Sequence, residues 1–415
     1  MKLTRYTRHG QKADIYIHQL LELIVKKILI YCEGDTVLSI MLSGSYGNGE
    51  GSIAELADGT IVPLSDFDIV IITANEVPEK RIRLLMSEIR NMLKLKCNNP
   101  YFEVDLKFFT MKEFAKRIPN ISASKVRYST VLYGKDLRGL VNEAVMPIDS
   151  VMILVHRASE VIKSVFYLQE RCIDVFTRCY INYQLNKCIM DIFLVYFILR
   201  KGLNIPSYRE ELDICKVAAE DILPLNLIKL KPLICDSIER KINDKKYFYE
   251  ADSTKLYAFA RKVLRMVIFD LFSSINISTA SPRKLSFDLN RKFICSRILS
   301  FIKLENGLLE LLLSPIVGIF DTLRFALKRR RLKVRDLFFM ASPLMRIYAA
   351  IIYLFLGLND VNVTGAISFN EQYVKKSYDA IKSLTKLDNY DPRELFNSIL
   401  QLLREYYDLK NIFPV

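Results

Sequence analysis

The period of the apolar positions changes near residue 145 of this chain. Before that point, short apolar runs of strand length lie between helical segments, and beyond it apolar residues recur mostly at helical spacing. Three early segments predict core strands, at residues 37–42, 67–73 and 101–109. In the last of these, apolar side chains alternate with Glu103, Asp105 and Lys107, so the strand has one apolar and one polar face.

The other segments of the first third predict what surrounds these strands. Asp58-Gly59 is a strong turn signal and predicts a short hairpin with arms at 52–56 and 60–64. Residues 128–133 have the composition of an edge strand. Apolar residues at helical spacing predict helices over 13–31, 77–95 and 111–117.

The chain beyond residue 145 predicts helices and no strand. The segments with helical spacing are 151–171, 175–201, 256–273, 293–303, 308–327, 334–356 and 392–409. We therefore expect an α+β fold. Its N-terminal domain, residues 1–145, has a mixed sheet flanked by helices, and residues 146–415 form an all-α region that binds the substrate. A polar stretch at 276–282 is a candidate boundary inside that region.

Charge adds an expectation about partners. The chain of 415 residues has a formal net charge of +14, which favours an anionic partner such as nucleic acid, nucleotide phosphate or a membrane surface. Solvated lysines are the plainer explanation. The densest basic run, from Lys328 to Arg335, is a candidate for binding an RNA backbone or another anionic surface, with a solvated helix end as its alternative.

Cysteine and histidine usage argues against a zinc protein. The eight cysteines form no C-x-x-C pair, and there are only three histidines. The N-terminus has no signal-peptide pattern. The longest uncharged apolar run, near 347–359, is shorter than the roughly 18 to 20 residues that span a bilayer. We expect a cytoplasmic protein without a transmembrane segment, and peripheral membrane association stays open.

The chemistry is concentrated between residues 42 and 72. The first strand runs into a small-residue turn at Gly44-Ser45, and the second opens with Asp66 and Asp68. Side chains two apart on a strand point to the same face, so the two carboxylates project together. A glycine lets the backbone approach phosphate closely, and the serine hydroxyl adds a donor. Carboxylates beside a phosphate site are suited to a divalent metal.

Asp105 supplies a third carboxylate if its strand neighbours that of Asp68. Three acidic side chains around a triphosphate suit two Mg²⁺ ions, with Mn²⁺ as an alternative. Glu103 is a rival third ligand, because it lies on the same strand face. We prefer Asp105 for its position between two apolar residues.

These residues resemble the polymerase-beta-type nucleotidyltransferase superfamily. The matching segments are Leu42 to Ser45, Asp66 to Asp68, and Val104 to Leu106, within residues 13–145. The resemblance implies transfer of a nucleoside monophosphate from an NTP, ATP or CTP, with release of pyrophosphate. By the same resemblance, Asp66 and Asp68 hold both metals, Asp105 completes one of them and is a candidate general base, and Gly44 and Ser45 bind the outer phosphates.

The chain departs from this pattern at two places. Twenty residues separate Ser45 from Asp66, more than is usual, and the predicted hairpin accounts for the extra length. Asn48 stands where many relatives have a basic residue, which removes one charge contact to the triphosphate. Lys187, on a predicted helix, is a candidate for that contact, because helical domains of this superfamily often contribute a basic residue. A surface lysine is its alternative.

The acceptor stays open at this point. An RNA 3′ end such as that of a tRNA, a small molecule, and a protein hydroxyl are all compatible with the sequence, the last including a toxin–antitoxin role. A protein that kept the fold and binds nucleotide without turnover is the alternative from a different class.

Overall fold

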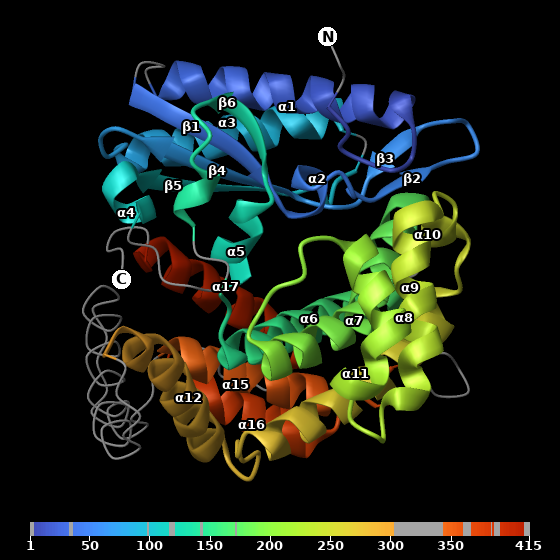
Figure 1. The fold of residues 1–415 in the computed structure, drawn as a ribbon. Helices are drawn as coiled ribbons and strands as arrows, with labels where there is room; N and C mark the ends of the chain where they lie inside the picture. Colours follow the sequence, from blue (N-terminus) through green and yellow to red (C-terminus); the bar gives the residue numbers. More distant parts are fainter. Residues whose placement is uncertain are drawn as a thin grey trace. The chain divides into compact units, whose positions relative to one another are not determined.

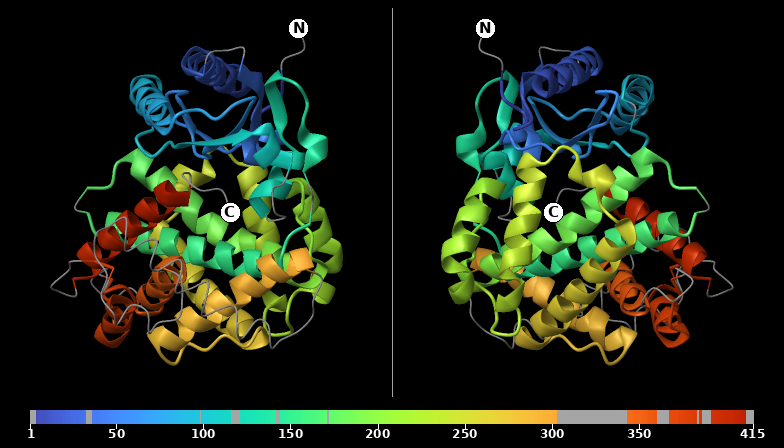
Figure 2. Two further views of the ribbon diagram at one scale, coloured as in Figure 1. Left: turned by 90° about the vertical axis from the view of Figure 1, so that its left-hand side faces the viewer. Right: turned by 90° about the vertical axis from the view of Figure 1, so that its right-hand side faces the viewer.

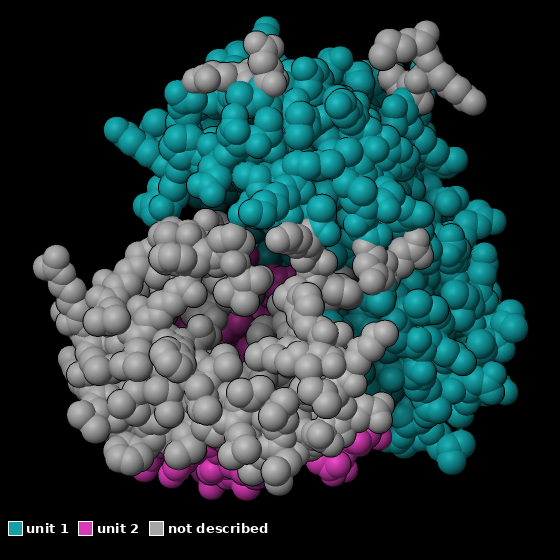
Figure 3. Space-filling view, turned by 60° about the vertical axis from the view of Figure 1, so that its left-hand side comes forward, with its two compact units in different colours: residues 1–150, 172–256 teal, residues 151–171, 257–415 magenta. Residues whose placement is uncertain are grey.

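The computed structural model describes residues 4–32, 36–97, 99–115, 121–141, 144–170, 172–302, 343–359, 367–382, 384–385 and 391–410 (Figure 1). The chain has two compact units. One comprises residues 1–150 and 172–256, and the other residues 151–171 and 257–415 (Figure 3). The candidate chemistry lies in the first unit.

A mixed four-stranded sheet forms the centre of the N-terminal part, as the sequence predicts. Its strands are β1 (Val37–Ser43), β4 (Phe67–Thr73), β5 (Val104–Thr110) and β6 (Thr130–Gly134). They lie in the order β5-β4-β1-β6, with β1 antiparallel to β4 and β6, and β4 parallel to β5. The segment predicted as an edge strand is at the edge. The predicted hairpin is also present, as β2 (Ile53–Glu55) and β3 (Ile61–Pro63).

Helices cover both faces of the sheet, which explains why β1 and β4 are apolar almost without alternation. Helices α1 (Gln11–Tyr31) and α3 (Glu79–Lys96) pack on one face (Figure 1). The short helices α4 (Met111–Ala115) and α5 (Ile121–Arg127) pack on the other. The sequence predicted α1, α3 and α4 but not α5, whose seven residues are too few to establish a helical period.

Among the described residues, the first unit also contains the helices α7 (Val175–Lys201), α8 (Tyr208–Ile222), α9 (Lys231–Asn243) and α10 (Tyr247–Glu250). Local signals set the ends of α7, because Asp174 accepts a hydrogen bond from the Thr177 amide and Gly202 adopts a left-handed conformation. The hairpin packs against α7 and α10 through one apolar cluster, which contains Ala54, Val62, Leu64, Cys179, Tyr183 and Phe248. The predicted division at residue 145 stays a prediction, and the compact units divide the chain elsewhere.

The second unit is helical in the part that the structure describes. Its helices are α6 (Pro147–Leu168), α11 (Ser253–Ser274), α12 (Pro282–Ile302), α15 (Pro343–Leu356), α16 (Glu371–Ile381) and α17 (Pro392–Lys410) (Figure 2). The first residues of α6 and α11 belong to the first unit. Residues 276–282 connect α11 to α12 inside this unit. The predicted helix at 308–327 and the basic run from Lys328 to Arg335 lie outside the described residues.

Within the described ranges, every helix is too short or too polar to cross a membrane.

Candidate active site

Asp68 and Asp105 face each other on adjacent parallel strands. They are register partners in the β4–β5 pair, so their side chains leave the sheet on the same face. The two strands are therefore neighbours, which is the condition that the sequence analysis set for Asp105 to join the site. The side chain of Asp68 is 33% exposed and that of Asp105 is 50% exposed, so both carboxylates are accessible to a ligand.

Lys107 lies two residues beyond Asp105 on the same face and places its ammonium group between the two carboxylates. Its Nζ is 2.9 Å from Asp105 Oδ2 and 3.9 Å from Asp68 Oδ1. The lysine compensates part of the negative charge that two facing carboxylates create. Sequence analysis did not include Lys107 in the site, although its i+2 spacing from Asp105 was the available signal.

Asp68 has a raised pKa because burial disfavours its charged form, and because the carboxylates of Asp66 and Asp105 are near. The positive charges of Lys107 and of Lys125, on α5, act in the opposite direction. Asp66 is exposed directly before β4, and its negative charge contributes to the raised pKa of Asp68. The site therefore concentrates negative charge that a cation would stabilise.

Gly44 begins the one-turn helix α2 (Gly44–Gly47) directly after β1. Its φ is +71°, and a Cβ built on it would lie 2.7 Å from Asp68 Oδ2. Glycine is therefore required both by the backbone conformation and by the carboxylate beside it. Sequence analysis predicted this glycine for the approach of a phosphate, whereas the group it makes room for in this structure is Asp68.

Ser45 is held through the backbone of the residues that follow it. Its carbonyl oxygen accepts a hydrogen bond of 2.7 Å from the Glu50 amide, and the Gly44 carbonyl accepts one of 3.2 Å from the Asn48 amide. The register of β1 against β4 pairs Ser43 with Asp68. The turn and the Asp68 carboxylate are thus adjacent, as predicted for a phosphate site beside a metal site.

Lys187, the predicted phosphate ligand, lies on α7 and is half-buried. Its Nζ is 5.2 Å from the centroid of the Tyr183 ring, and its charge contributes to a lowered pKa at Lys241. These contacts place Lys187 on the face of α7 toward α9 and the hairpin. Both its contact with a triphosphate and the alternative of a surface lysine stay predictions.

The donor set is suited to a hard divalent ion, since Asp66, Asp68 and Asp105 offer only carboxylate oxygens. Among the described residues, no group of three or more His, Cys, Asp and Glu side chains is close enough to hold a cation. A Mg²⁺ ion at these carboxylates would therefore take its remaining ligands from substrate phosphates and water, which is its usual coordination in nucleotide sites.

Two further charged residues near the turn, Glu50 and Lys241, were missed by sequence analysis. Both are buried, at 2% and 0% exposure. They meet across 191 residues of sequence, so no local pattern could indicate the contact.

No protein-family model matches the chain. No curated protein sequence matches it either. One similar solved structure is spectinomycin adenyltransferase AAD(9) from Enterococcus faecialis with ATP and spectinomycin. It shares 14% sequence identity, and the match covers 60% of this chain and 99% of that one, at a TM-score of 0.35. A likeness of this size does not assign the chain to a family.

Proposed function

We propose that the chain is a metal-dependent nucleotidyltransferase that moves a nucleoside monophosphate from an NTP to an acceptor and releases pyrophosphate. The observation that supports this proposal best is the pairing of Asp68 with Asp105 beside the turn that begins at Gly44. Two facing carboxylates next to a tight backbone turn provide for a cation and a phosphate at one place.

Asp66 and Asp68 would hold Mg²⁺, or Mn²⁺, and Asp105 would share that role. When bound, the metal neutralises the triphosphate and lowers the pKa of the attacking hydroxyl. In this proposal the acceptor O–H gives its proton to the Asp105 carboxylate, its oxygen bonds to the α-phosphorus, and the bond to the pyrophosphate oxygen breaks. The backbone at Gly44 and Ser45 holds the outer phosphates, with Lys187 as a further cation.

The nucleotide is ATP or CTP in this proposal. The acceptor is a hydroxyl or phosphate of a small molecule, of an RNA 3′ end or of a protein. The charge of the chain is compatible with each of these classes, so the acceptor is an outcome of the experiment below.

A catalytically silent nucleotide-binding protein is the second candidate. Lys107 favours it, because an ammonium group 2.9 Å from Asp105 already compensates charge that a metal would otherwise compensate. If this candidate is right, the chain binds NTP without Mg²⁺ and releases no pyrophosphate.

The test is incubation with each α-labelled NTP and Mg²⁺, in separate reactions with total RNA, a protein extract and a metabolite extract. We expect label in one acceptor fraction, with its loss in Asp68→Asn. Asp58→Asn is the matched control, because Asp58 lies in the exposed hairpin turn, where it accepts a hydrogen bond from Thr60. Label in no fraction, together with NTP binding that does not depend on Mg²⁺, would favour the silent protein.

A further inference from the structure

The residues that follow the Gly44-Ser45 turn fold back onto it. The Glu50 amide donates to the Ser45 carbonyl, and the Asn48 amide donates to the Gly44 carbonyl. Gly49, between them, has a φ of +82°. Glu50 is therefore joined through its own backbone to the turn that the proposed function assigns to phosphate binding.

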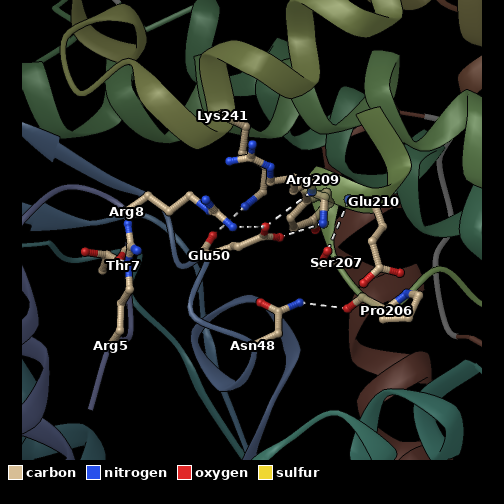
Figure 4. A network of polar contacts seen from close by, with 11 residues as sticks. Arg5, Thr7, Arg8, Asn48, Glu50, Pro206, Ser207, Arg209, Glu210 and Lys241 are labelled. Carbon is tan, nitrogen blue, oxygen red and sulfur yellow. Dashed lines mark hydrogen bonds and ion pairs between the residues drawn. The ribbon is translucent and has the colours of Figure 1, made fainter. Parts of the chain in front are cut away.

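The side chain of Glu50 binds the beginning of helix α8 (Figure 4). Its carboxylate accepts hydrogen bonds of 2.6 Å from the Tyr208 amide and 3.2 Å from the Arg209 amide. It also pairs with Arg8, at 3.2 Å. The first amides of a helix have no partner inside the helix and carry partial positive charge, so a carboxylate is stabilised there. Ser207 accepts from the third amide, that of Glu210, at 3.2 Å.

The first three amides of α8 are thus occupied by protein side chains. The same amides are what would bind a phosphate at a helix N-terminus. We infer that the anion that stabilises this helix end is Glu50 itself. The side chain is 1% exposed, and a buried carboxylate without such partners would be strongly destabilising.

Lys241 of α9 binds the other side of the same loop. Its Nζ donates to the Glu50 carbonyl at 3.1 Å and to Ser52 Oγ at 2.9 Å, and it lies 3.9 Å from the centroid of the Tyr208 ring. Asn48 adds a hydrogen bond of 2.9 Å from its Nδ2 to the Pro206 carbonyl, just before α8. The loop 48–52 is therefore held by α8 and α9 together.

We propose that Glu50 is a positioning residue, which holds the Gly44-Ser45 turn at a fixed place against α8 and α9. The proposal deepens the proposed function and rests on it for the nucleotide measurement. It also gives a role to Asn48, which helps to attach the turn to the helical part of the same unit.

Hydrogen exchange of the full-length chain tests the proposal directly. In Glu50→Gln, the side chain loses the negative charge that binds the start of α8. The side-chain NH₂ group of glutamine would also face the N–H donors of Tyr208 and Arg209. We expect backbone exchange within residues 44–50 to rise about tenfold, because the loop whose residue-50 amide bonds the Ser45 carbonyl is no longer anchored to α8 by a carboxylate. Glu55→Gln is the matched control, because Glu55 pairs with Lys245 at 2.8 Å but is partly exposed and away from the turn. Its exchange within residues 44–50 should be unchanged.

A nucleotide measurement separates positioning from general destabilisation. We expect the KM for Mg-NTP to rise about tenfold in Glu50→Gln with kcat within about twofold of wild type, and neither to change in Glu55→Gln. If wild-type protein neither binds nor turns over NTP, the proposed function fails, and the exchange measurement alone decides whether Glu50 holds the turn.

Asn48→Ala keeps the test decisive if Glu50→Gln does not fold. It removes a single hydrogen bond, and we expect about a threefold rise in exchange within residues 44–50. Unchanged exchange there in the folded variants, or an equal rise in Glu55→Gln, would overturn the proposal.

Discussion

Lys107 determines how much negative charge the paired aspartates present to a ligand. On a polar strand face, residues two apart are neighbours, and here the ammonium group reaches both carboxylates. Asp68 and Asp105 are register partners on adjacent strands. Without a cation near them, the two carboxylates would repel each other. Lys107 thus reduces the repulsion between the two carboxylates, and it would compete with a metal for the same oxygens.

Replacing Lys107 with Met should strengthen metal binding. Removal of a positive charge near Asp68 and Asp105 favours a divalent cation there, and we expect the Kd for Mn²⁺ to fall about tenfold. Titration followed by Mn²⁺ electron paramagnetic resonance measures it. Lys12→Met is the control, since Lys12 is exposed and donates to the Gly59 carbonyl. Equal affinity in both variants would contradict this role for Lys107.

Asp68→Asn should remove metal-dependent activity while leaving the fold intact. The carboxylate is partly exposed, and its raised pKa indicates that the charge is not favoured by the folded state. We therefore expect turnover to fall by at least about a thousandfold, with a change of about 1 kcal/mol or less in the free energy of unfolding. Pyrophosphate release and urea unfolding measure the two effects. Full activity in Mg²⁺ would refute the site.

Lys241 predicts a pH dependence of stability. Burial lowers its pKa to about 7, and the charge of Lys187 contributes in the same direction. In the unfolded chain the pKa is near the ordinary 10.5, so between these values the unfolded state binds more protons and stability rises with pH. Relative to Lys241→Met, wild-type stability should increase by up to about 1.4 kcal/mol for each pH unit above 7.

Urea unfolding of both proteins at pH 7, 8 and 9 checks this slope. A constant difference between them across that range would show that Lys241 keeps its charge in the folded protein. Below about pH 7, the pKa of Lys241 in the folded protein, this lysine is protonated in both the folded and the unfolded chain. The difference in stability between wild type and Lys241→Met should therefore not change with pH in that range.

At the scale of elements, the turn at α2 connects the sheet to the helices. Gly44 leaves room for the Asp68 carboxylate, the Ser45 carbonyl accepts from the Glu50 amide, and the Glu50 side chain binds the N-terminus of α8. The end of β1 and the turn at α2 lie within ten residues of Glu50 in the sequence. The Glu50 side chain links both of them to the start of α8. The partner helix comes from more than 150 residues away.

Gly44→Ala should damage this connection. A left-handed backbone costs an alanine about 1–2 kcal/mol, and its Cβ would collide with Asp68 Oδ2. Gly59→Ala is the matched control, because Gly59 has a φ of +78° and its Cβ would meet only the end of Lys12, at 3.4 Å. We expect weaker Mg-NTP binding in Gly44→Ala alone. Isothermal titration measures it, and equal binding in the two variants would contradict the role of the Asp68 contact.

At the scale of the molecule, the first unit is built from two separate stretches of chain. Its hairpin buries Val62 and Leu64 against Tyr183 and Phe248, and Ser65 Oγ is 2.8 Å from the Tyr183 hydroxyl. The sheet domain therefore lacks part of its core when the chain is cut at the predicted boundary.

A fragment of residues 1–145 should be much less stable than the full chain. Exposing Val62 and Leu64 costs about 1.5–3 kcal/mol each, a large share of a typical stability of about 5–15 kcal/mol. We expect the fragment to bind a hydrophobic dye and to melt without a cooperative transition. Near-ultraviolet circular dichroism checks this, and a cooperative transition at the melting temperature of the full chain would contradict it.

The sequence by itself determined the strands, the hairpin and the residues of the candidate site. Each of these follows from local regularities: alternation along residues 102–108, the turn at Asp58-Gly59, and the i+2 spacing of Asp66 and Asp68. These signals depend on residues a few positions apart, so a single sequence reports them. The helices α5, α8 to α10 and α16 were not predicted, and of these α5 and α10 are too short to establish a helical period.

Tertiary structure alone decided which atoms surround the turn. The bond of Glu50 to Tyr208 spans 158 residues and that of Lys241 to Glu50 spans 191. Neither partner has a local pattern that distinguishes it from a surface charge. Their burial depends on how α8 and α9 pack against the loop. The residues of the candidate site could therefore be chosen from neighbours in sequence, whereas the contacts that hold the turn in place could not.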